Sequence, residues 1–579
     1  MDLTKIPFAD PLTLKFYNPL FNEIGDHSLP ITFSPKITSI NRAFGFPDSQ
    51  NTNPATSIPG KIKTQLLDIE GAWQVNKASG NEIEAYFKGN GGNFYSLIRD
   101  VKLNEISYGG IKYPAGEIGT PHDVLEHMST KLNAIYPTDE YCVFCAYMPN
   151  AYGEDTLEAQ KLVNEVDHDE SGTPFVKYRG EYPGFDYNTN DTVYLFVGTV
   201  IDYLFAEYGY KIGRSIFKDH PDLRRLVVFN TFNRRGWYDF DYRQLVPKIL
   251  CSDFLKAITN RFNIAFFINE RTKTVDIISF DQLISKGITI LKTKFTSNPE
   301  VNNNRVAGLT FPQNPPDAWS THEITGMENF PYGTLVEVAT FRDISTLEVD
   351  IFKISYVRAE NAWYEIVKVD GINTPQRVCP KHFTYKDGTG ELEITQYSGI
   401  PAMYRYVKAF NWTEEEGVPP APVPHSTEGD FVMPRCDLEC CDKRLPNKEF
   451  PLMFLFTRGV QTGYIVPYEG DEGPGSLWYY PMGSNTIYDT EGDVISGATL
   501  SLYWDGAEGL IENFWKNRND WEINIKKIVT GLLSIDDINK LIDFAQVIRI
   551  ENNNYLVSKI EAELTPRSIR ITEAELYRL

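Results

Sequence analysis

The chain has 579 residues, a formal net charge of −22 and a sequence pI of about 4.9. This length implies several domains, because a single hydrophobic core stops growing beyond roughly 250–300 residues. The acidic excess argues against nucleic-acid binding as the main role, since phosphate contact needs clustered lysine and arginine.

The sequence also limits the cellular compartment. The first residues, MDLTKIPFADPLTLKFYN, lack the basic leader and apolar run of a secretory signal. No window approaches the roughly 18 uninterrupted apolar residues of a membrane span. Seven cysteines are an odd and modest number, which fits reduced thiols. We therefore expect a chain that folds in the cytoplasm of its cell, with no membrane span and no disulfide scaffold.

The first segment, 1–110, is predicted as a small antiparallel β-barrel. Apolar and polar residues alternate between glycine- and asparagine-rich turns, with strands expected at 61–67, 82–88 and 94–103. Asn90-Gly91-Gly92-Asn93 is expected to be a turn, because Asn and Gly tolerate positive φ. Strand edges exposed by such a unit would make a ring if they paired between subunits.

The next segment, 111–193, reads as an inserted or elaborated region. Cys142 and Cys145 have the spacing of half a zinc site, which Cys436, Cys440 and Cys441 would complete. In a strand, however, residues three apart point to opposite faces, so two buried structural cysteines are favoured. The sequence leaves metal binding by these five cysteines open.

Two further polar motifs are compared with known catalytic and metal sites, and the alternative in each case is a set of ordinary surface residues. His122 and His127 are five residues apart in HDVLEH, whereas a metalloprotease helix needs its histidines on one face. A polar helix is therefore favoured. Acidic neighbours occur at Asp167, Asp169 and Glu170, and at Asp239 and Asp241, but coincidence is expected among 78 acidic residues. We predict no catalytic set, no cofactor and no metal.

Segment 194–290 is predicted to combine helices with a β-hairpin. A helix is expected at 199–208, with Thr199 and Asp202 as a capping pair and Gly209 ending it. A buried strand follows at 226–229. The loop after it contains Arg234, Arg235 and Trp237, residue types favoured at interface hot spots. These three are the candidate interface residues, and the alternative is a self-packed surface loop.

Residues 252–280 carry the clearest local pattern. Ser252 is a suitable N-cap, and apolar residues then recur at helical spacing at Phe254, Leu255, Ile258 and Phe262. Asn263 is expected to close the helix. Strands are predicted at 264–269 and 274–280, joined by a charged turn. Nothing in this unit is reactive, so it reads as a packing module.

The remaining chain is divided into three parts. Segment 291–410 is expected to form a second β-rich barrel, with strands at 335–341, 351–357 and 363–369. Segment 411–448 reads as a loop or linker rich in proline, acidic residues and cysteine. Segment 449–579 is predicted as an α+β domain with strands at 500–504, 547–550, 555–562 and 568–576, and a helix burying Leu510, Ile511, Phe514 and Trp515.

Three stretches in order along the chain resemble tail hub proteins of tailed bacteriophages, especially those infecting Bacteroidetes. They are SLPITFSPKITSINRAFGFPD, SDFLKAITNRFNIAFFINERTKTVDIISFDQLI, and the closing EGLIENFWKNRNDW with IDFAQVIRIENNNYLVSKIEAEL. The resemblance implies an α+β, β-rich multidomain fold with hub-type split barrels and short helices.

The same resemblance implies a structural virion protein and no enzyme. It implies a homotrimer whose paired barrels form a pseudo-sixfold ring between tail tube and tip, with an axial channel for DNA ejection. Its implied partners are a tail tube or distal tail protein, a tip or spike protein and a tape measure protein. Two alternatives are a cell-wall-degrading glycosidase or peptidase of the tail, and a receptor- or carbohydrate-binding tail protein.

Overall fold

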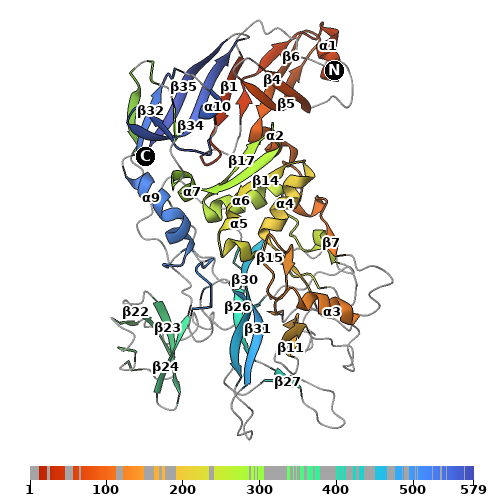
Figure 1. The fold of residues 1–579 in the computed structure, drawn as a ribbon, viewed down its shortest axis with the longest axis vertical. Helices are drawn as coiled ribbons and strands as arrows, with labels where there is room; N and C mark the ends of the chain where they lie inside the picture. The colour runs from red at the N-terminus through yellow and green to blue at the C-terminus, as the bar shows by residue number, and fades with distance from the viewer. Residues whose placement is uncertain are drawn as a thin grey trace.

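The computed structural model describes a chain with three levels along its long axis (Figure 1). A large sheet lies at one end, short helices around a small sheet form the middle, and the long strands β30 (Met453–Ile465) and β31 (Ser476–Ser484) reach the other end. The described residues are 12–21, 26–45, 57–63, 67–111, 121–148, 162–168, 173–176, 191–233, 240–285, 289–291, 294–296, 298–304, 309, 336–338, 343–344, 347–348, 352–357, 362–369, 372–378, 400–401, 403–408, 410–412, 422–424, 430–435, 450, 452–465, 476–484, 487, 494–502, 504, 506–524, 526–534, 538–542, 544–565 and 568–579.

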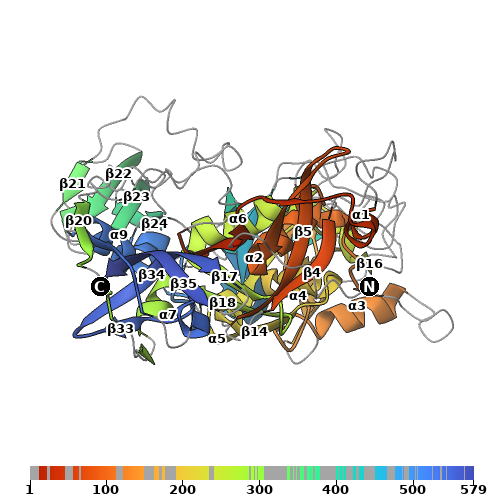
Figure 2. The same cartoon turned by 90° about the horizontal axis from the view of Figure 1, so that it is seen from above.

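The large sheet is built from both ends of the described chain. Its order is β20-β32-β35-β34-β1-β2-β6-β5-β4, with β3 beside β6, and β33 between β34 and β19. Segments 1–110 and 449–579, predicted as separate domains, are joined because β1 pairs with β34 from Leu12↔Leu564 to Tyr17↔Lys559. Both sets of strands lie at the same end of the molecule (Figure 1), and seen from above β34 and β35 lie on one side of it and β4 and β5 on the other (Figure 2). The strands are β1 (Leu12–Tyr17), β2 (His27–Ser28), β3 (Ile31–Phe33), β4 (Ser57–Lys63), β5 (Asp68–Ala78), β6 (Ile83–Gly89), β19 (Thr289–Ile290), β20 (Glu300–Asn304), β32 (Lys526–Gly531), β33 (Ile548–Ile550), β34 (Asn553–Leu564) and β35 (Ile569–Arg578).

Period-two alternation explains why these strands form a sheet with one buried face. In β1, Leu12, Leu14 and Phe16 are buried and the residues between them are partly exposed. The buried residues pack in one core with Ile83, Phe87 and Ile560. Strands predicted at 82–88, 547–550, 555–562 and 568–576 are confirmed with small shifts at their ends, whereas the sequence missed β5.

The strand predicted at 94–103 is wrong. Asn90-Gly91-Gly92-Asn93 forms the first turn of helix α2 (Asn90–Leu97) instead of a turn between strands. Phe94 and Ile98 are four residues apart and both are 0% exposed, so helical backbone places the two side chains in one core. The short segment η1 (Leu103–Glu105) follows.

The middle level contains the helix and hairpin module that the sequence predicted. Helix α6 (Cys251–Phe262) leads through Asn263, in the left-handed conformation with φ 47°, into β17 (Ile264–Asn269) and β18 (Thr274–Ser279). The helix begins at Cys251 with Leu250 at the N-cap position, so Ser252 lies inside the first turn and its predicted capping role is wrong. Strand β14 (Lys211–Ser215) extends the hairpin, parallel to β18.

The helix predicted at 199–208 is α4 (Val197–Glu207). It begins two residues before Thr199, with Phe196 at the N-cap and no side-chain capping bond, so the capping pair is wrong. Gly209 follows at φ 78°, as predicted for its end. The buried strand predicted at 226–229 is confirmed as β15 (Leu226–Phe229). The other helices and short elements of the two upper levels are α1 (Thr38–Ala43), α5 (Ile216–Asp219), η3 (Leu223–Arg225), η4 (Tyr242–Gln244), α7 (Phe280–Ser285), η7 (Ile511–Trp515), α9 (Lys516–Ile523), α10 (Ile538–Leu541), and the pair β7 (Gly110–Ile111) and β16 (Phe240–Asp241).

Several smaller sheets complete the structure. Strand β15 pairs with β30, which also pairs with β31 and β25 (Ile400–Pro401). The expected strands of segment 291–410 occur as a separate sheet of β21 (Val336–Val338), β22 (Phe352–Val357), β23 (Ala362–Val369) and β24 (Ile372–Val378). The others are helix α3 (Pro121–Ser129) and the strands β8 (Tyr141–Cys142), β9 (Ala146–Tyr147), β10 (Leu162–Val163), β11 (Val166–His168), β12 (Pro174–Val176), β13 (Tyr194–Leu195), β26 (Met403–Lys408), β27 (Phe410–Trp412), β28 (Pro422–Pro424) and β29 (Asp430–Arg435).

The fold is thus β-rich, with antiparallel sheets and short helices, and none of the sheets among the described residues closes into a barrel. The strand predicted at 500–504 is wrong. Leu500, Leu502 and Trp504 are buried, but the local backbone bonds to residues 508 and 511 and not to a neighbouring strand. The linker predicted at 411–448 includes β28 and β29.

Candidate functional site

The predicted interface residues Arg234, Arg235 and Trp237 lie outside the described residues, so this prediction stays a prediction. The same holds for Cys436, Cys440 and Cys441, and for Asp169, Glu170 and Asp239.

The cysteines and histidine that the structure does place have structural partners. Cys142 is fully buried in β8, and burial raises the pKa of its thiol. The Cys145 thiol donates to the Asn164 carbonyl at 2.8 Å. His127 Nε2 lies 2.7 Å from the Tyr141 hydroxyl, and burial lowers the pKa of this imidazole. Among the described residues, no three His, Cys, Asp or Glu side chains are grouped to hold a metal ion.

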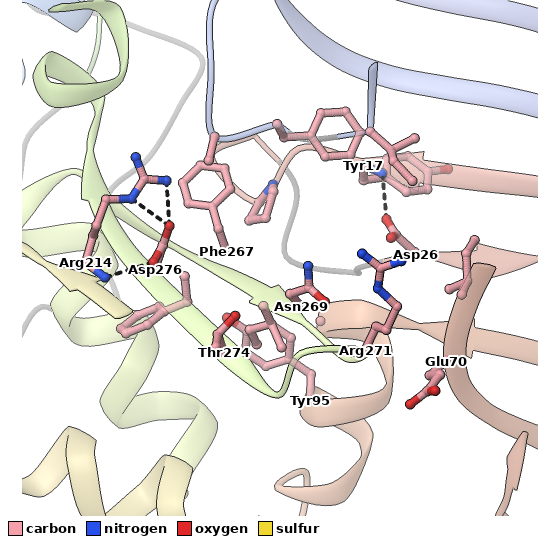
Figure 3. Close-up of a pocket in the computed structure, with 18 of the residues that line it drawn as sticks. Tyr17, Asp26, Glu70, Tyr95, Arg214, Phe267, Asn269, Arg271, Thr274 and Asp276 are labelled. Carbon is pink, nitrogen blue, oxygen red and sulfur yellow. Dashed lines mark hydrogen bonds and ion pairs between the residues drawn. The ribbon is translucent and has the colours of Figure 1, made fainter. Parts of the chain in front are cut away.

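A cleft of about 380 Å³ lies between the large sheet and the middle level (Figure 3). Residues of β14, β17 and β18 form one wall, and residues of β1, β5, α2 and the segment 542–545 form the others. Tyr17, Tyr95, Phe267 and Phe544 contribute aromatic surface. The cleft thus joins segments from across the described chain.

Charged groups on the two sides of the cleft differ. On the wall formed by β14 and β18, Arg214 Nε donates to Asp276 at 2.7 Å, and the Arg214 backbone N–H donates to the same carboxylate at 2.9 Å. On the large-sheet side lie Asp26, Asp68 and Glu70.

Those carboxylates are partly paired already. Lys61 Nζ is 2.8 Å from Asp68 and 3.3 Å from Glu70. The Tyr17 N–H donates to Asp26 at 3.2 Å. Arg271, at the tip of the hairpin, is turned toward the Asp26 side in Figure 3 and has no hydrogen bond or ion pair with another described residue. The Arg271 guanidinium, which has no partner among the described residues, thus lies opposite an acidic wall.

A buried carboxylate fixes the hairpin tip that carries Arg271. Glu270 is 2% exposed, accepts from Asn93 Nδ2 at 3.0 Å and Lys273 Nζ at 2.5 Å, and also accepts from the Tyr210 hydroxyl. Burial, followed by the hydrogen bond to Glu270, raises the pKa of Tyr210. The turn between β17 and β18 is thereby tied to α2 and to the start of β14.

The main path of the large sheet ends at β4, beside β5, and at β20, beside β32. The short strands β3 and β19 branch from that path and also have one neighbour each among the described strands. In β20, residues 300–303 are exposed, and Val301 retains 55% of its surface. In β4, Pro59, Lys61 and Lys63 are exposed. Unpaired edges carry free N–H and C=O groups that can accept a further strand.

No family model, curated protein or solved structure matches this chain. In the part of the chain that is described, no helix is both long and apolar enough to cross a membrane.

The sequence did not indicate the cleft. Its charged residues Asp26, Arg214 and Arg271 come from separate segments and carry no motif. The hairpin was predicted, but which side of β17 would meet the large sheet depends on long-range packing.

Proposed function

We propose that the protein is a structural virion protein, the hub of a bacteriophage tail tip or baseplate. It forms a ring that joins the tail tube to the distal tip and leaves an axial channel for DNA. The proposal starts from the resemblance of three segments to tail hub proteins. It is supported most by one observation, the twelve-stranded sheet whose main path ends at β4 and β20 with no further described strand beside either.

Two open edges on one sheet favour ring assembly. When edge β20 of one copy pairs with edge β4 of the next, the contact is head-to-tail, and such contacts form rings when the rotation closes. Charge is complementary, because β4 exposes Lys63 and β20 exposes Glu300.

In this proposal each half of the large sheet, strands β2 to β6 and strands β32 to β35, has the role that one split barrel has in a tail hub protein. Three copies then supply six similar units, which fits a trimer below a hexameric tube. In this proposal the neighbours are a tail tube or distal tail protein, a tip or spike protein and a tape measure protein. The protein assembles in the host cytoplasm and ends in the virion.

Native mass spectrometry of the full chain tests the proposal. We expect a species of three times the 66.1 kDa of one chain. Val301→Lys places a charge on the open edge and is expected to weaken assembly by roughly tenfold or more. Val494→Lys is the matched control, since Val494 is 59% exposed but lies outside the large sheet.

A wild-type protein that remains monomeric over the accessible concentration range would contradict the proposal. Equal effects of the two lysine variants would show that the edge of β20 plays no part.

A further inference from the structure

A histidine lies where the middle level meets the long strand β30. His220 follows helix α5 and precedes η3, which leads directly into β15, the neighbour of β30 (Figure 1). Its ring nitrogen Nδ1 accepts from the backbone N–H of Asp222 at 3.2 Å and of Leu223 at 3.4 Å. Side chains of Asn and Asp form such turns with the backbone that follows them. His220 therefore fixes the turn at the entry to η3.

The residue that this turn places is the centre of a buried polar cluster. Asp222 is 0% exposed, and its carboxylate accepts from Arg458 Nη1 of β30 at 2.6 Å. The same carboxylate accepts from the Thr499 hydroxyl at 2.5 Å and from the Thr499 backbone N–H at 3.2 Å. Arg458 Nη2 donates in turn to the Leu500 carbonyl at 2.8 Å. The position of Asp222 thus links η3, β30 and the segment 499–500.

This turn requires a neutral imidazole. Both groups that face Nδ1 are N–H donors, so Nδ1 carries no proton and the ring proton of the neutral form is on Nε2. A second proton can be added only at Nδ1. There it removes the acceptor and directs a third N–H toward the two backbone N–H groups. Protonation of His220 is therefore incompatible with the turn that places Asp222.

The ring is also placed where solvent protons reach it. His220 is partly exposed, and its ring lies 5.8 Å from the ring of Phe514 in η7. The charged residues of α5, η3 and η7, which contact His220, and of β30 beside Asp222 are Lys218, Asp219, Asp222, Arg224, Arg225, Glu512 and Arg458.

The direction of the pH effect follows from this environment. Burial, the larger effect, lowers the pKa of His220, whereas the charge of Asp222 raises it. The folded state favours the neutral ring, so the turn is complete above the ordinary pKa of 6.5 and is lost as the pH falls from there through the folded-state pKa.

We propose that His220 is an acid-sensitive switch: protonation of its ring opens the turn at 220–223 and releases the hold of Asp222 on β30 and on the segment 499–500. Strands β15 and β30 stay paired from Leu226↔Phe456 to Phe229↔Met453, so the change is a local opening of the junction. Leu500 and Leu502 are buried in the core beside it, so the opening exposes apolar surface. This inference does not depend on the ring contacts at β4 and β20.

Hydrogen exchange of the purified full chain at about pH 7.5 and about pH 5 tests the proposal, with protection factors corrected for the intrinsic pH dependence of amide exchange. His220→Asn supplies a side-chain oxygen that accepts from the same N–H groups and does not titrate. His220→Ala removes the acceptor at both pH values. His127→Gln is the matched control, because burial also lowers the pKa of His127, whereas its ring bonds to Tyr141 and not to η3.

We expect acid to lower the protection of wild-type residues 221–225 and 498–502 roughly tenfold, because the two hydrogen bonds to Nδ1 are lost. His220→Asn should keep most of this protection at both pH values, and His220→Ala should lack it at both. His127→Gln should respond like the wild type. Strand β5 (68–78) is the internal reference, and its protection should change less than that of the junction.

An equal loss in the wild type and in His220→Asn would overturn the proposal, because that variant retains every carboxylate and an acidic group would then be responsible. Full protection of His220→Ala at the higher pH would also overturn it. So would a wild-type loss that is absent, or that is as large in β5 as at the junction. Val301→Lys should respond to acid like the wild type, so failure here is distinguishable from failure of the ring.

Discussion

The buried ion pair between Asp222 and Arg458 should be one of the most sensitive points of the fold. Asp222 is 0% exposed, and its carboxylate accepts from Arg458 Nη1 at 2.6 Å and from the Thr499 hydroxyl at 2.5 Å. Arg458 Nη2 also donates to the Leu500 carbonyl at 2.8 Å. Burial lowers the pKa of Arg458 to about 10, while Asp222 opposes that shift.

Asp222→Asn preserves shape but leaves the Arg458 guanidinium buried without a counter-charge. Removing one partner of a buried pair costs about 3–5 kcal/mol. Asp241→Asn is the matched control, because its partner Arg243 is 59% exposed. An exposed pair contributes about 1 kcal/mol or less.

Hydrogen exchange of the paired strands β15 and β30 is the suitable assay, since Leu226 pairs with Phe456 close to Arg458. Exchange reports local opening free energies, which are well defined even when a multidomain chain does not unfold in one step. The double variant Asp222→Asn/Arg458→Met should recover part of the loss. If Asp222→Asn costs no more than Asp241→Asn, the electrostatic reasoning is refuted.

Three further predictions concern single residues. Asn263→Gly keeps the positive φ but removes the side-chain oxygen that accepts from Arg518 Nη1 at 2.8 Å. The free energy of unfolding in urea should therefore fall by about 1–3 kcal/mol, and an unchanged urea midpoint would refute this. Burial lowers the pKa of His127 below its ordinary 6.5, because the folded state favours the neutral imidazole. The folded state is therefore not destabilised by His127 above pH 6.5, and it loses stability as the pH falls from 6.5 through the folded-state pKa. His127→Gln should flatten the dependence of the urea midpoint on pH in that window, and an unaltered slope would count against this. Gly198→Ala places a methyl group 2.5 Å from the Tyr136 ring, so it should destabilise by about 1–3 kcal/mol despite the better helix propensity of alanine; a stabilised variant would disprove the clash.

Local patterns predicted the elements whose determinants are close in sequence. The module at 252–280 was predicted because its helix spacing, its left-handed Asn263 and its hairpin are set within 30 residues. The sequence predicted a turn at 90–93 and a strand at 94–103 because Asn-Gly-Gly-Asn suits both a turn and a first helical turn. Only the burial of Phe94 and Ile98 in one core distinguishes them.

Long-range features left no comparable signal. The pairing of β1 with β34 joins residues more than 500 positions apart, so no local pattern indicates it. Arg261, Arg458 and Arg518 are all buried, contrary to the usual exposure of arginine. Their partners include carbonyl groups and aromatic rings brought near by folding, such as the Leu502 carbonyl at 2.9 Å from Arg261.

Photo-crosslinking between copies tests assembly through strand edges most directly. Benzoylphenylalanine replaces Val301 in one preparation, which is mixed with isotopically labelled wild-type chain, and the crosslinked peptides are identified by mass spectrometry. The account predicts crosslinks from position 301 to residues 57–63 of the labelled copy. Crosslinks found only within one chain, or to a labelled surface remote from β4, would contradict it.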